Sequence, residues 1–245
     1  MKVKADVSTT VLRAIKILNY LKETPGPQSI SYISKELELS STIVHRLLTT
    51  LKMEGFVFQD SQSKLYSLGT VFMDYANKIM TELPYAPIVE PWLIKLRNIT
   101  EETVGFYIPN GHMRLCVLEY ESQQEIRRSV GVGKQHPIYA GATGRAILAF
   151  QPEETQQRVI QSLPLEKRQV LAEKIQATRE NGYAISMGEI SSNVSALSAP
   201  VFDHQHRVIG ALSISGPAFR FHEEMVTKHI ATLVQATKEI SVTFG

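Results

Sequence analysis

The sequence contains little cysteine and no long hydrophobic run. Cys116 is the single cysteine among 245 residues, which excludes an internal disulfide and a structural zinc site built on paired thiolates. We expect this thiol to lie buried in a strand as a small apolar side chain. The longest apolar runs, such as residues 208–214, are far too short to span a bilayer, and the first residues hold no secretory h-region. These absences favour a cytoplasmic protein without a membrane partner.

Motifs for cofactors and metals are missing as well. The strings "GVGKQHP" and "GATGR" are rich in glycine, but neither has the spacing of a phosphate-binding loop. His204 and His206 lie two residues apart, which fits a polar turn between strands better than a metal site. Ser213, His136 and Asp203 could be combined into a catalytic triad, but these residue types are common and their spacing matches no known motif. We expect no cofactor, no metal and no catalytic residue.

Charge is distributed unevenly along the chain. The net charge is +2, yet residues 1–80 carry ten Lys/Arg against seven Asp/Glu, and residues 81–245 carry sixteen against seventeen. This asymmetry weakly favours an N-terminal segment that meets phosphates.

The first 69 residues have the element order of a winged helix-turn-helix. Residues 8–22 have apolar residues at helical spacing, with Ser8 as the expected N-cap and an inward face of Val11, Ile15, Leu18 and Leu21. A shorter helix over residues 29–37 and a third from Ser41 follow. Strands over residues 56–59 and 64–68, joined by a polar turn, complete the pattern.

The third helix carries the candidate DNA contacts. On a helical wheel its apolar half holds Ile43, Val44, Leu47, Leu48 and Leu51. The other half and the amino end hold short polar or basic residues suited to base edges and phosphates, namely Ser40, Ser41, Thr42, His45, Arg46 and Thr49. Lys64 in the wing is a further candidate phosphate contact.

A polar helix face is also what any solvated surface helix shows, and winged helices also bind proteins. Two features favour double-stranded DNA: the order of the elements, and the short side chains where an ordinary solvated face has Glu and Lys. We therefore expect the third helix to enter a major groove.

The remaining chain changes to mixed α and β character. A linker helix is expected over residues 70–83, followed by an α+β domain over residues 84–245. Its strands are expected over residues 104–109, 114–121, 126–133, 183–188, 194–202 and 208–215. Helices are expected over residues 88–100, from an opening near 141–143 to residue 150, as a pair within 152–181, and at the end over 223–242. Three strands, helices and three more strands favour a largely antiparallel sheet.

Three segments resemble the isocitrate lyase regulator (IclR) family of bacterial transcription factors. They are "STIVHRLLTTLKMEGFVFQDSQSKLYSLG", "HPIYAGATGRAILA", and "TRENGYAISMGE" followed by "SALSAPVFDHQHRVIGALSISGP". The resemblance covers nearly the whole chain in the right order. It implies a winged helix-turn-helix joined by a helix to a GAF-like, effector-binding domain, in a homodimer or homotetramer on operator DNA. Repression is the commoner mode in the family, although activators occur.

The resemblance also places a pocket for a small organic or aromatic acid in the second domain. Its implied lining is Ala140, Gly141, Ala142, Thr143, Gly144, Ser186, Glu189, Ala196, Ser198, Ser213 and Ser215. Phe106 or Tyr139 could line it too. The chain departs from the family pattern at Arg145, where lysine is frequent, at Ser186, where an acid is frequent, and at Asn193, where glycine is common.

An enzyme that acts on a small metabolite in the second domain is the alternative, with the first domain serving only in oligomerisation. The effector, the operator sequence, the sign of regulation and the choice of dimer or tetramer do not follow from the sequence.

Overall fold

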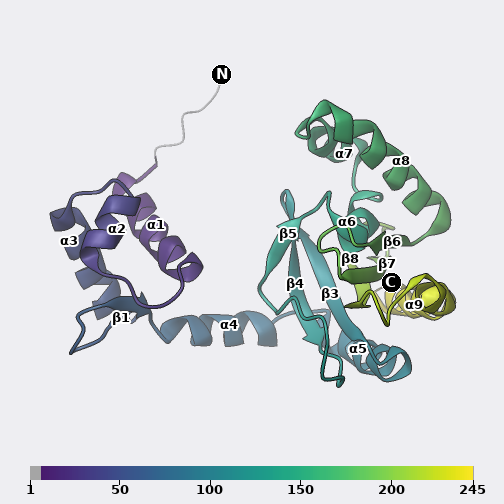
Figure 1. The fold of residues 1–245 in the computed structure, drawn as a ribbon, viewed down its shortest axis with the longest axis horizontal. Helices are drawn as coiled ribbons and strands as arrows, with labels where there is room; N and C mark the ends of the chain where they lie inside the picture. Colours follow the sequence, from purple (N-terminus) through teal and green to yellow (C-terminus); the bar gives the residue numbers. More distant parts are fainter. Residues whose placement is uncertain (1–6, 245) are drawn as a thin grey trace. The chain divides into compact units, whose positions relative to one another are not determined.

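The computed structural model describes residues 7–244. This part of the chain divides at Leu83 and Pro84 into two compact units, each with its own core (Figure 1).

The first unit is a winged helix-turn-helix followed by one further helix. Its elements are α1 (Thr9–Glu23), α2 (Ile30–Glu36), α3 (Ser41–Met53), β1 (Val57–Gln59), β2 (Tyr66–Leu68) and α4 (Val71–Thr81). The strands pair antiparallel to form the wing. Ile17, Ile33, Val44 and Leu48 are fully buried between the first three helices and the wing. The predicted architecture of this part is confirmed.

The inward face predicted for the first helix is wrong at two positions. Val11 and Ile15 are 57% and 47% exposed, whereas Ile17 is fully buried. Val11 lies before the part of α1 that meets the core, since the core cluster includes no α1 residue before Ala14, and Ile15 lies beside the face formed by Ala14, Ile17 and Leu21. The amino-terminal half of α1 therefore presents apolar side chains outside the core of its own unit.

The second unit is a six-stranded antiparallel sheet covered by helices on both faces. The spatial order is β5-β4-β3-β8-β7-β6. The strands are β3 (Thr103–Asn110), β4 (Met113–Tyr120), β5 (Gln135–Pro137), β6 (Ala184–Met187), β7 (Val194–Phe202) and β8 (Val208–Pro217). In Figure 1, α5 (Ala86–Thr100) and α9 (Glu223–Thr243) lie on one side of the sheet and α6 (Gly141–Leu148) on the other. The hairpin of α7 (Glu153–Gln161) and α8 (Leu165–Asn181) packs outside α6 through α8.

Alternation along the central strands decides what faces α6. Successive side chains of a strand point to opposite faces. Ser213 and Ser215 of β8 share the α6 face, whereas Leu212 and Ile214 are fully buried on the opposite one. Cys116 is fully buried in β4, as expected.

One predicted strand of the second unit is absent. The strand predicted over residues 126–133 does not form, and a short β5 follows it instead. Residues 129–131 form hydrogen bonds with a side chain instead of with a neighbouring strand. The Glu119 carboxylate accepts from Ser129 Oγ, Val130 N and Gly131 N. The helix predicted to open near residues 141–143 is α6, which begins at Gly141 and ends at Leu148, two residues before the predicted end. The other predicted strands of this unit match within two residues.

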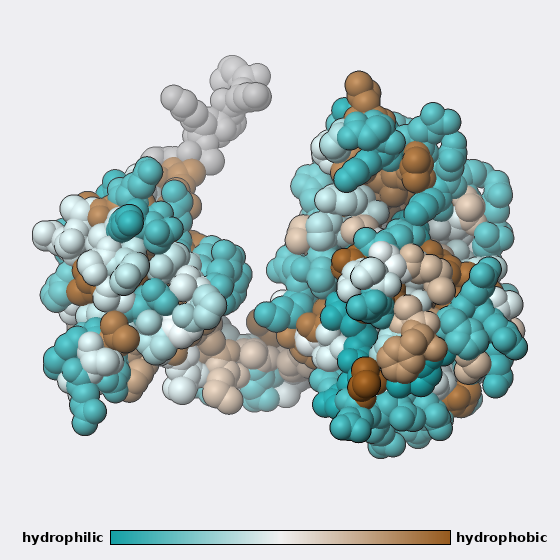
Figure 2. All heavy atoms as spheres, viewed as in Figure 1, coloured by the Kyte–Doolittle hydropathy of each residue, from teal (hydrophilic) through white to brown (hydrophobic). Residues whose placement is uncertain are grey.

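Most of the surface visible in Figure 2 is hydrophilic, with apolar residues scattered singly or in small groups. Within residues 7–244, no helix combines the length and apolar character needed to cross a bilayer.

Candidate nucleic-acid interface and effector pocket

The amino end of α3 is capped by Ser40. Its hydroxyl accepts a hydrogen bond from Ile43 N at 3.4 Å, which leaves the remaining first-turn N–H groups pointing out of the helix. Ser41, Thr42, His45 and other short polar residues of the helix are exposed. A helix end of this kind favours a phosphate.

The exposed face of α3 keeps hydrogen-bonding capacity. The Thr49 hydroxyl donates to His45 O at 2.9 Å and the Thr50 hydroxyl donates to Arg46 O at 3.2 Å. Both oxygens retain lone pairs for an outside donor. Arg46 is exposed and makes no ion pair within residues 7–244. The guanidinium is thus free for a bidentate contact.

The wing between β1 and β2 is held by Asp60. Its carboxylate accepts from Gln62 N, Ser63 N and Ser63 Oγ at 3.2, 2.7 and 2.7 Å, and these bonds lower the pKa of Asp60. Lys64 is exposed, with a left-handed φ of 59°. The turn therefore presents the Lys64 ammonium to solvent.

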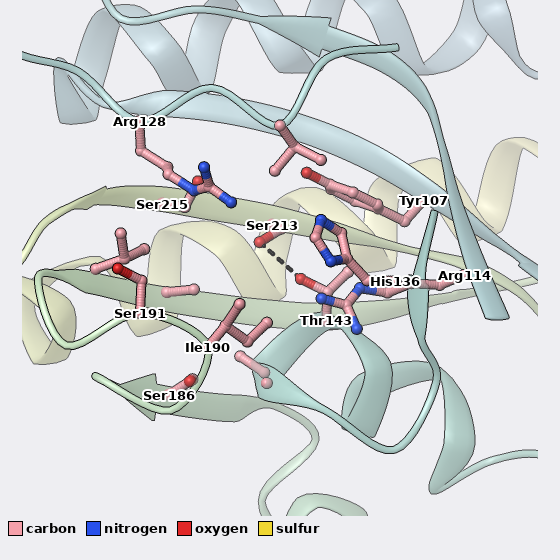
Figure 3. A pocket seen from close by; sticks show the side chains of 15 residues that line it. Tyr107, Arg114, Arg128, His136, Thr143, Ser186, Ile190, Ser191, Ser213 and Ser215 are labelled. Atoms are coloured by element: carbon pink, nitrogen blue, oxygen red, sulfur yellow. Dashed lines mark hydrogen bonds between the residues drawn. The ribbon is translucent and has the colours of Figure 1, made fainter. Parts of the chain in front are cut away.

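A cavity of about 40 Å³ lies between the sheet and the start of α6 in the second unit (Figure 3). It is lined from several segments by Tyr107, Arg114, Arg128, Val130, His136, Gly141, Ala142, Thr143, Ser186, Ile190, Ser191, Val194, Ala196, Ser213 and Ser215. This volume has room for about one to three water molecules.

Three hydroxyls form a closed set at the base of this cavity. Thr143 Oγ1 lies 3.0 Å from both Ser198 Oγ and Ser213 Oγ, and the two serine oxygens lie 2.9 Å apart. All three residues are buried. The set joins α6 to β7 and β8 and presents the Ser213 hydroxyl to the cavity.

Arg114 is the most buried charge of the pocket. Its residue is 4% exposed, and its Nη1 donates to Pro137 O and Ala140 O at 2.8 and 2.6 Å. Its Nε has no hydrogen-bond partner among the described residues. Burial, followed by the charges of Arg145 and Arg128, lowers the pKa of Arg114 to about 10, so the guanidinium remains charged at neutral pH.

His136 and Arg128 add further basic groups, and Tyr107 adds a phenol. Burial, together with the charges of Arg114 and Arg128, lowers the pKa of His136, which makes the imidazole neutral at pH 7.5. Burial keeps the Tyr107 pKa well above its ordinary value. The Arg128 guanidinium donates to Ser129 O at 2.8 Å and forms no ion pair within residues 7–244.

The segment that follows β6 closes one side of the cavity. Ile190 packs against Gly141, where an added Cβ would lie 2.6 Å from Ile190 Cδ1. The neighbouring Glu189 pairs with Arg145 and, at 3.0 Å, with Lys174. Burial raises the pKa of Glu189, but the bonds and charges of these two cations outweigh it and lower the pKa overall. The segment is therefore fastened to α6 and α8.

Comparison with known proteins assigns the family. The model for the C-terminal domain of the bacterial transcriptional regulator IclR matches residues 77–242, and the IclR helix-turn-helix model matches residues 10–61. The chain belongs to the IclR family. The family consists of bacterial transcriptional regulators, so the expected class of DNA-binding regulator is confirmed.

IclR-family relatives match over nearly the full chain. The HTH-type transcriptional regulator KipR of Bacillus subtilis is 29% identical, over 96% of this chain and 97% of KipR. The transcriptional repressor IclR of Escherichia coli K12 is 26% identical, over 96% and 90%. The crystal structure of an IclR transcriptional regulator from Alicyclobacillus acidocaldarius has a TM-score of 0.83 and 26% identity, over 98% and 100%.

The pocket of this IclR-family chain contains most of the residues that the resemblance implied. Gly141, Ala142, Thr143, Ser186, Ala196, Ser213 and Ser215 line the cavity. Ser198 lies behind Thr143 and Ser213, and Gly144 packs under Arg114. The Ala140 carbonyl accepts a hydrogen bond from Arg114, and Glu189 forms salt bridges with Arg145 and Lys174.

The sequence analysis missed the basic residues of the pocket. Arg114, Arg128 and His136 stand on β4, on the segment mispredicted as a strand, and on β5. Only the pairing of β4 with β5 brings Arg114 and His136 opposite each other. Alternation along β4 was the one available signal, because a lone arginine on the covered face of a strand needs a partner.

The aromatic residues predicted for the pocket do not line it. Tyr107 lines the cavity, whereas Phe106 is fully buried on the opposite face and Tyr139 is 38% exposed outside it. Asp203 lies in the β7–β8 turn, where its carboxylate bonds to Arg207 and to Gln205 N. No Ser-His-Asp set is formed by Ser213, His136 and Asp203.

Proposed function

We propose that this chain is a cytoplasmic, homo-oligomeric repressor that reads operator DNA through α3 and responds to a small organic acid in the second unit. The observation that carries the DNA-binding part is the exposed face of α3, where a capped helix end and short polar side chains lie beside an unpaired arginine. The repressor role is supported by the name of the Escherichia coli relative.

In this proposal the α3 residues divide by role. Thr42, His45, Arg46 and Thr49 contact base edges or nearby phosphates, since all four are exposed on one face. Ser40 acts through the helix end that it caps, and Ser41 lies beside it on the same end. Lys64 contacts a neighbouring phosphate from the wing.

The test is the affinity for promoter DNA of the Arg46→Ala variant. We expect a loss of about 1–3 kcal/mol in operator binding, because a bidentate contact to a base edge or phosphate is removed. Arg158→Ala is the matched control, since Arg158 is 61% exposed on α7 and contacts only its own helix. Titrations at two salt concentrations should show binding that weakens steeply with salt.

An unchanged operator affinity of Arg46→Ala would remove Arg46 from the interface. Absence of any DNA binding at low salt would reject the regulator and favour the alternative, in which the second unit is an enzyme.

The effector part is supported by the cavity between α6 and the sheet. Its hydroxyls and the buried Arg114 suit a carboxylate, because charge-assisted hydrogen bonds from arginine are strong in a dry site. An effector changes the operator equilibrium only if it binds one state of the protein more tightly than the other. We propose that α4, which follows the wing in sequence, takes part in this coupling.

A further inference from the structure

The pocket concentrates positive charge without a counter-ion from the protein. Arg114 and Arg128 line it beside the neutral imidazole of His136, and none of the fifteen lining residues is acidic. The carboxylates of adjoining segments have other partners: Glu119 binds residues 129–131, and Glu189 binds Arg145 and Lys174. An anion inside the cavity would therefore meet no competing protein carboxylate.

The buried Arg114 makes such an anion energetically favourable. A cation taken out of water without a counter-ion destabilises the folded state. Two carbonyls satisfy Nη1 of Arg114, but Nε is buried without a partner and no salt bridge within residues 7–244 involves this side chain. A carboxylate in contact with this guanidinium offsets that cost.

The basic groups lie at two ends of the cavity rather than at one point. In Figure 3, Arg128 lies beside Ser215, while His136 and Arg114 lie toward Thr143. The Ser213 hydroxyl lies between the two groups. Within residues 7–244, neither Arg114 nor Arg128 has a protein carboxylate as a partner, so two negative charges balance the pocket, whereas a single charge leaves it net positive.

The space between the two ends is small and partly apolar. Val130, Ala142 and Ala196 contribute apolar walls, and Ile190 limits the cavity by packing on Gly141. The volume of about 40 Å³ is well below the roughly 150 Å³ of a cavity that accepts a benzene ring. Any diacid exceeds this volume, so the wall must open to admit it, and a linear aliphatic chain is narrower in cross-section than a ring.

From these observations we propose that the effector is a short-chain dicarboxylate, with one carboxylate on Arg114 and His136 and the other on Arg128. The inference rests on the proposed role of this pocket as the effector site and adds the charge and size of the molecule.

Calorimetric titration of the full-length protein at pH 7.5 tests the inference. The probes are malonate, succinate and glutarate, each compared with its monoamide, which keeps the chain length and removes one charge. We expect at least one diacid to bind about tenfold or more tightly than its monoamide.

Arg128→Gln then locates the second carboxylate. Arg128 is half-buried, so the variant should fold, and its circular dichroism verifies this. We expect the variant to bind the diacid about as weakly as the monoamide, with the affinity for the monoamide changed less than threefold. Arg127→Gln is the matched control, because Arg127 pairs with Glu121 outside the cavity, and it should keep the preference for the diacid.

Each outcome has a separate meaning. Equal affinity for diacid and monoamide, or binding of no diacid at all, overturns the inference, as does an unchanged preference in Arg128→Gln. Diacid binding that leaves operator affinity unchanged supports the inference about the pocket and rejects the proposed effector control. Loss of operator binding in every condition rejects the regulator function alone.

Discussion

At the scale of single residues, two adjacent serines that look equivalent in the sequence have different surroundings. Ser40 caps α3 through Ile43 N, whereas Ser41 is the exposed first residue of the helix and its hydroxyl makes no hydrogen bond within the described chain. The cap satisfies one of the free N–H groups at the helix start.

We therefore expect Ser40→Ala to lower the free energy of unfolding of the first unit by about 1 kcal/mol. Ser41→Ala, the matched control, should change it by less than about 0.5 kcal/mol. Urea denaturation followed by circular dichroism measures both. Equal losses in the two variants would mean that the cap does not contribute.

His136 gives the pocket a pH response. Burial and the charges of Arg114 and Arg128 lower its pKa, so the imidazole is neutral at pH 7.5. A bound dicarboxylate counters those cations and raises the pKa of His136. The Tyr107 phenol faces the same cavity but stays protonated, because burial raises its pKa.

Diacid affinity should accordingly increase as pH falls from 8 to 6, with uptake of a proton. Calorimetry in two buffers of different ionisation enthalpy counts that proton. His136→Gln should flatten the pH profile. A wild-type affinity that is constant over this range would show that His136 does not contact the bound carboxylate.

At the scale of elements, α6 depends on a close approach that glycine permits. A Cβ on Gly144 would lie 2.2 Å from Ile138 O and 2.9 Å from Arg114 Nη1. The strand-to-helix segment that carries Ile138 thus packs directly on the helix backbone, and the same contact positions Arg114.

Gly144→Ala should destabilise the second unit by about 1–3 kcal/mol, because the Ile138 carbonyl must move to admit the methyl group. Helix propensity alone predicts the opposite sign, a stabilisation of about 1 kcal/mol. Thermal unfolding distinguishes the two. A more stable variant would show that the contact relaxes without cost.

Elements with a strong period were predictable, and the segment without one was not. The leucine stripe of α3 predicted that element because burial of one face dominates its energy, and the mostly apolar run of β7 is buried on both faces. Residues 126–133 also alternate weakly, but a single carboxylate from β4 outcompetes strand pairing for their N–H groups. Such a contact between segments leaves no periodic signal.

Some residues of the candidate site were also predictable from the sequence, and others were not. The resemblance implied the hydroxyls and the α6 turn, because each of them lies within one of the short motifs that carry it. The basic groups of the cavity come together only through β-pairing and the folded 126–133 segment. Tyr107, rather than Phe106, faces the cavity because of the register of β3, which a one-residue error would invert.

At the scale of the whole molecule, the two units have separate cores. One cluster packs Ile17, Ile33 and Leu48, and another packs Tyr107, Ile147 and Val208. A ligand that binds only folded protein stabilises the unit that holds it, by about 2.7 kcal/mol at a concentration one hundred times the Kd.

We therefore expect calorimetric unfolding to show two transitions, with a bound diacid raising the Tm of the second unit and operator DNA raising that of the first. Ser40→Ala and Gly144→Ala assign the transitions, since each lies in one unit. A single transition that both ligands shift equally would mean that the units unfold as one.

The anchoring of residues 129–131 by Glu119 has a consequence for how regulators of this kind diversify. The segment that carries Arg128 and Val130 contributes to the cavity wall without pairing in the sheet. Its side chains can be substituted without loss of the strand pairing or of the packing of the helices on the sheet. Substitutions at residues 128 and 130 can therefore change the cavity lining at low cost in folding, because the Glu119 carboxylate rather than sheet pairing holds residues 129–131.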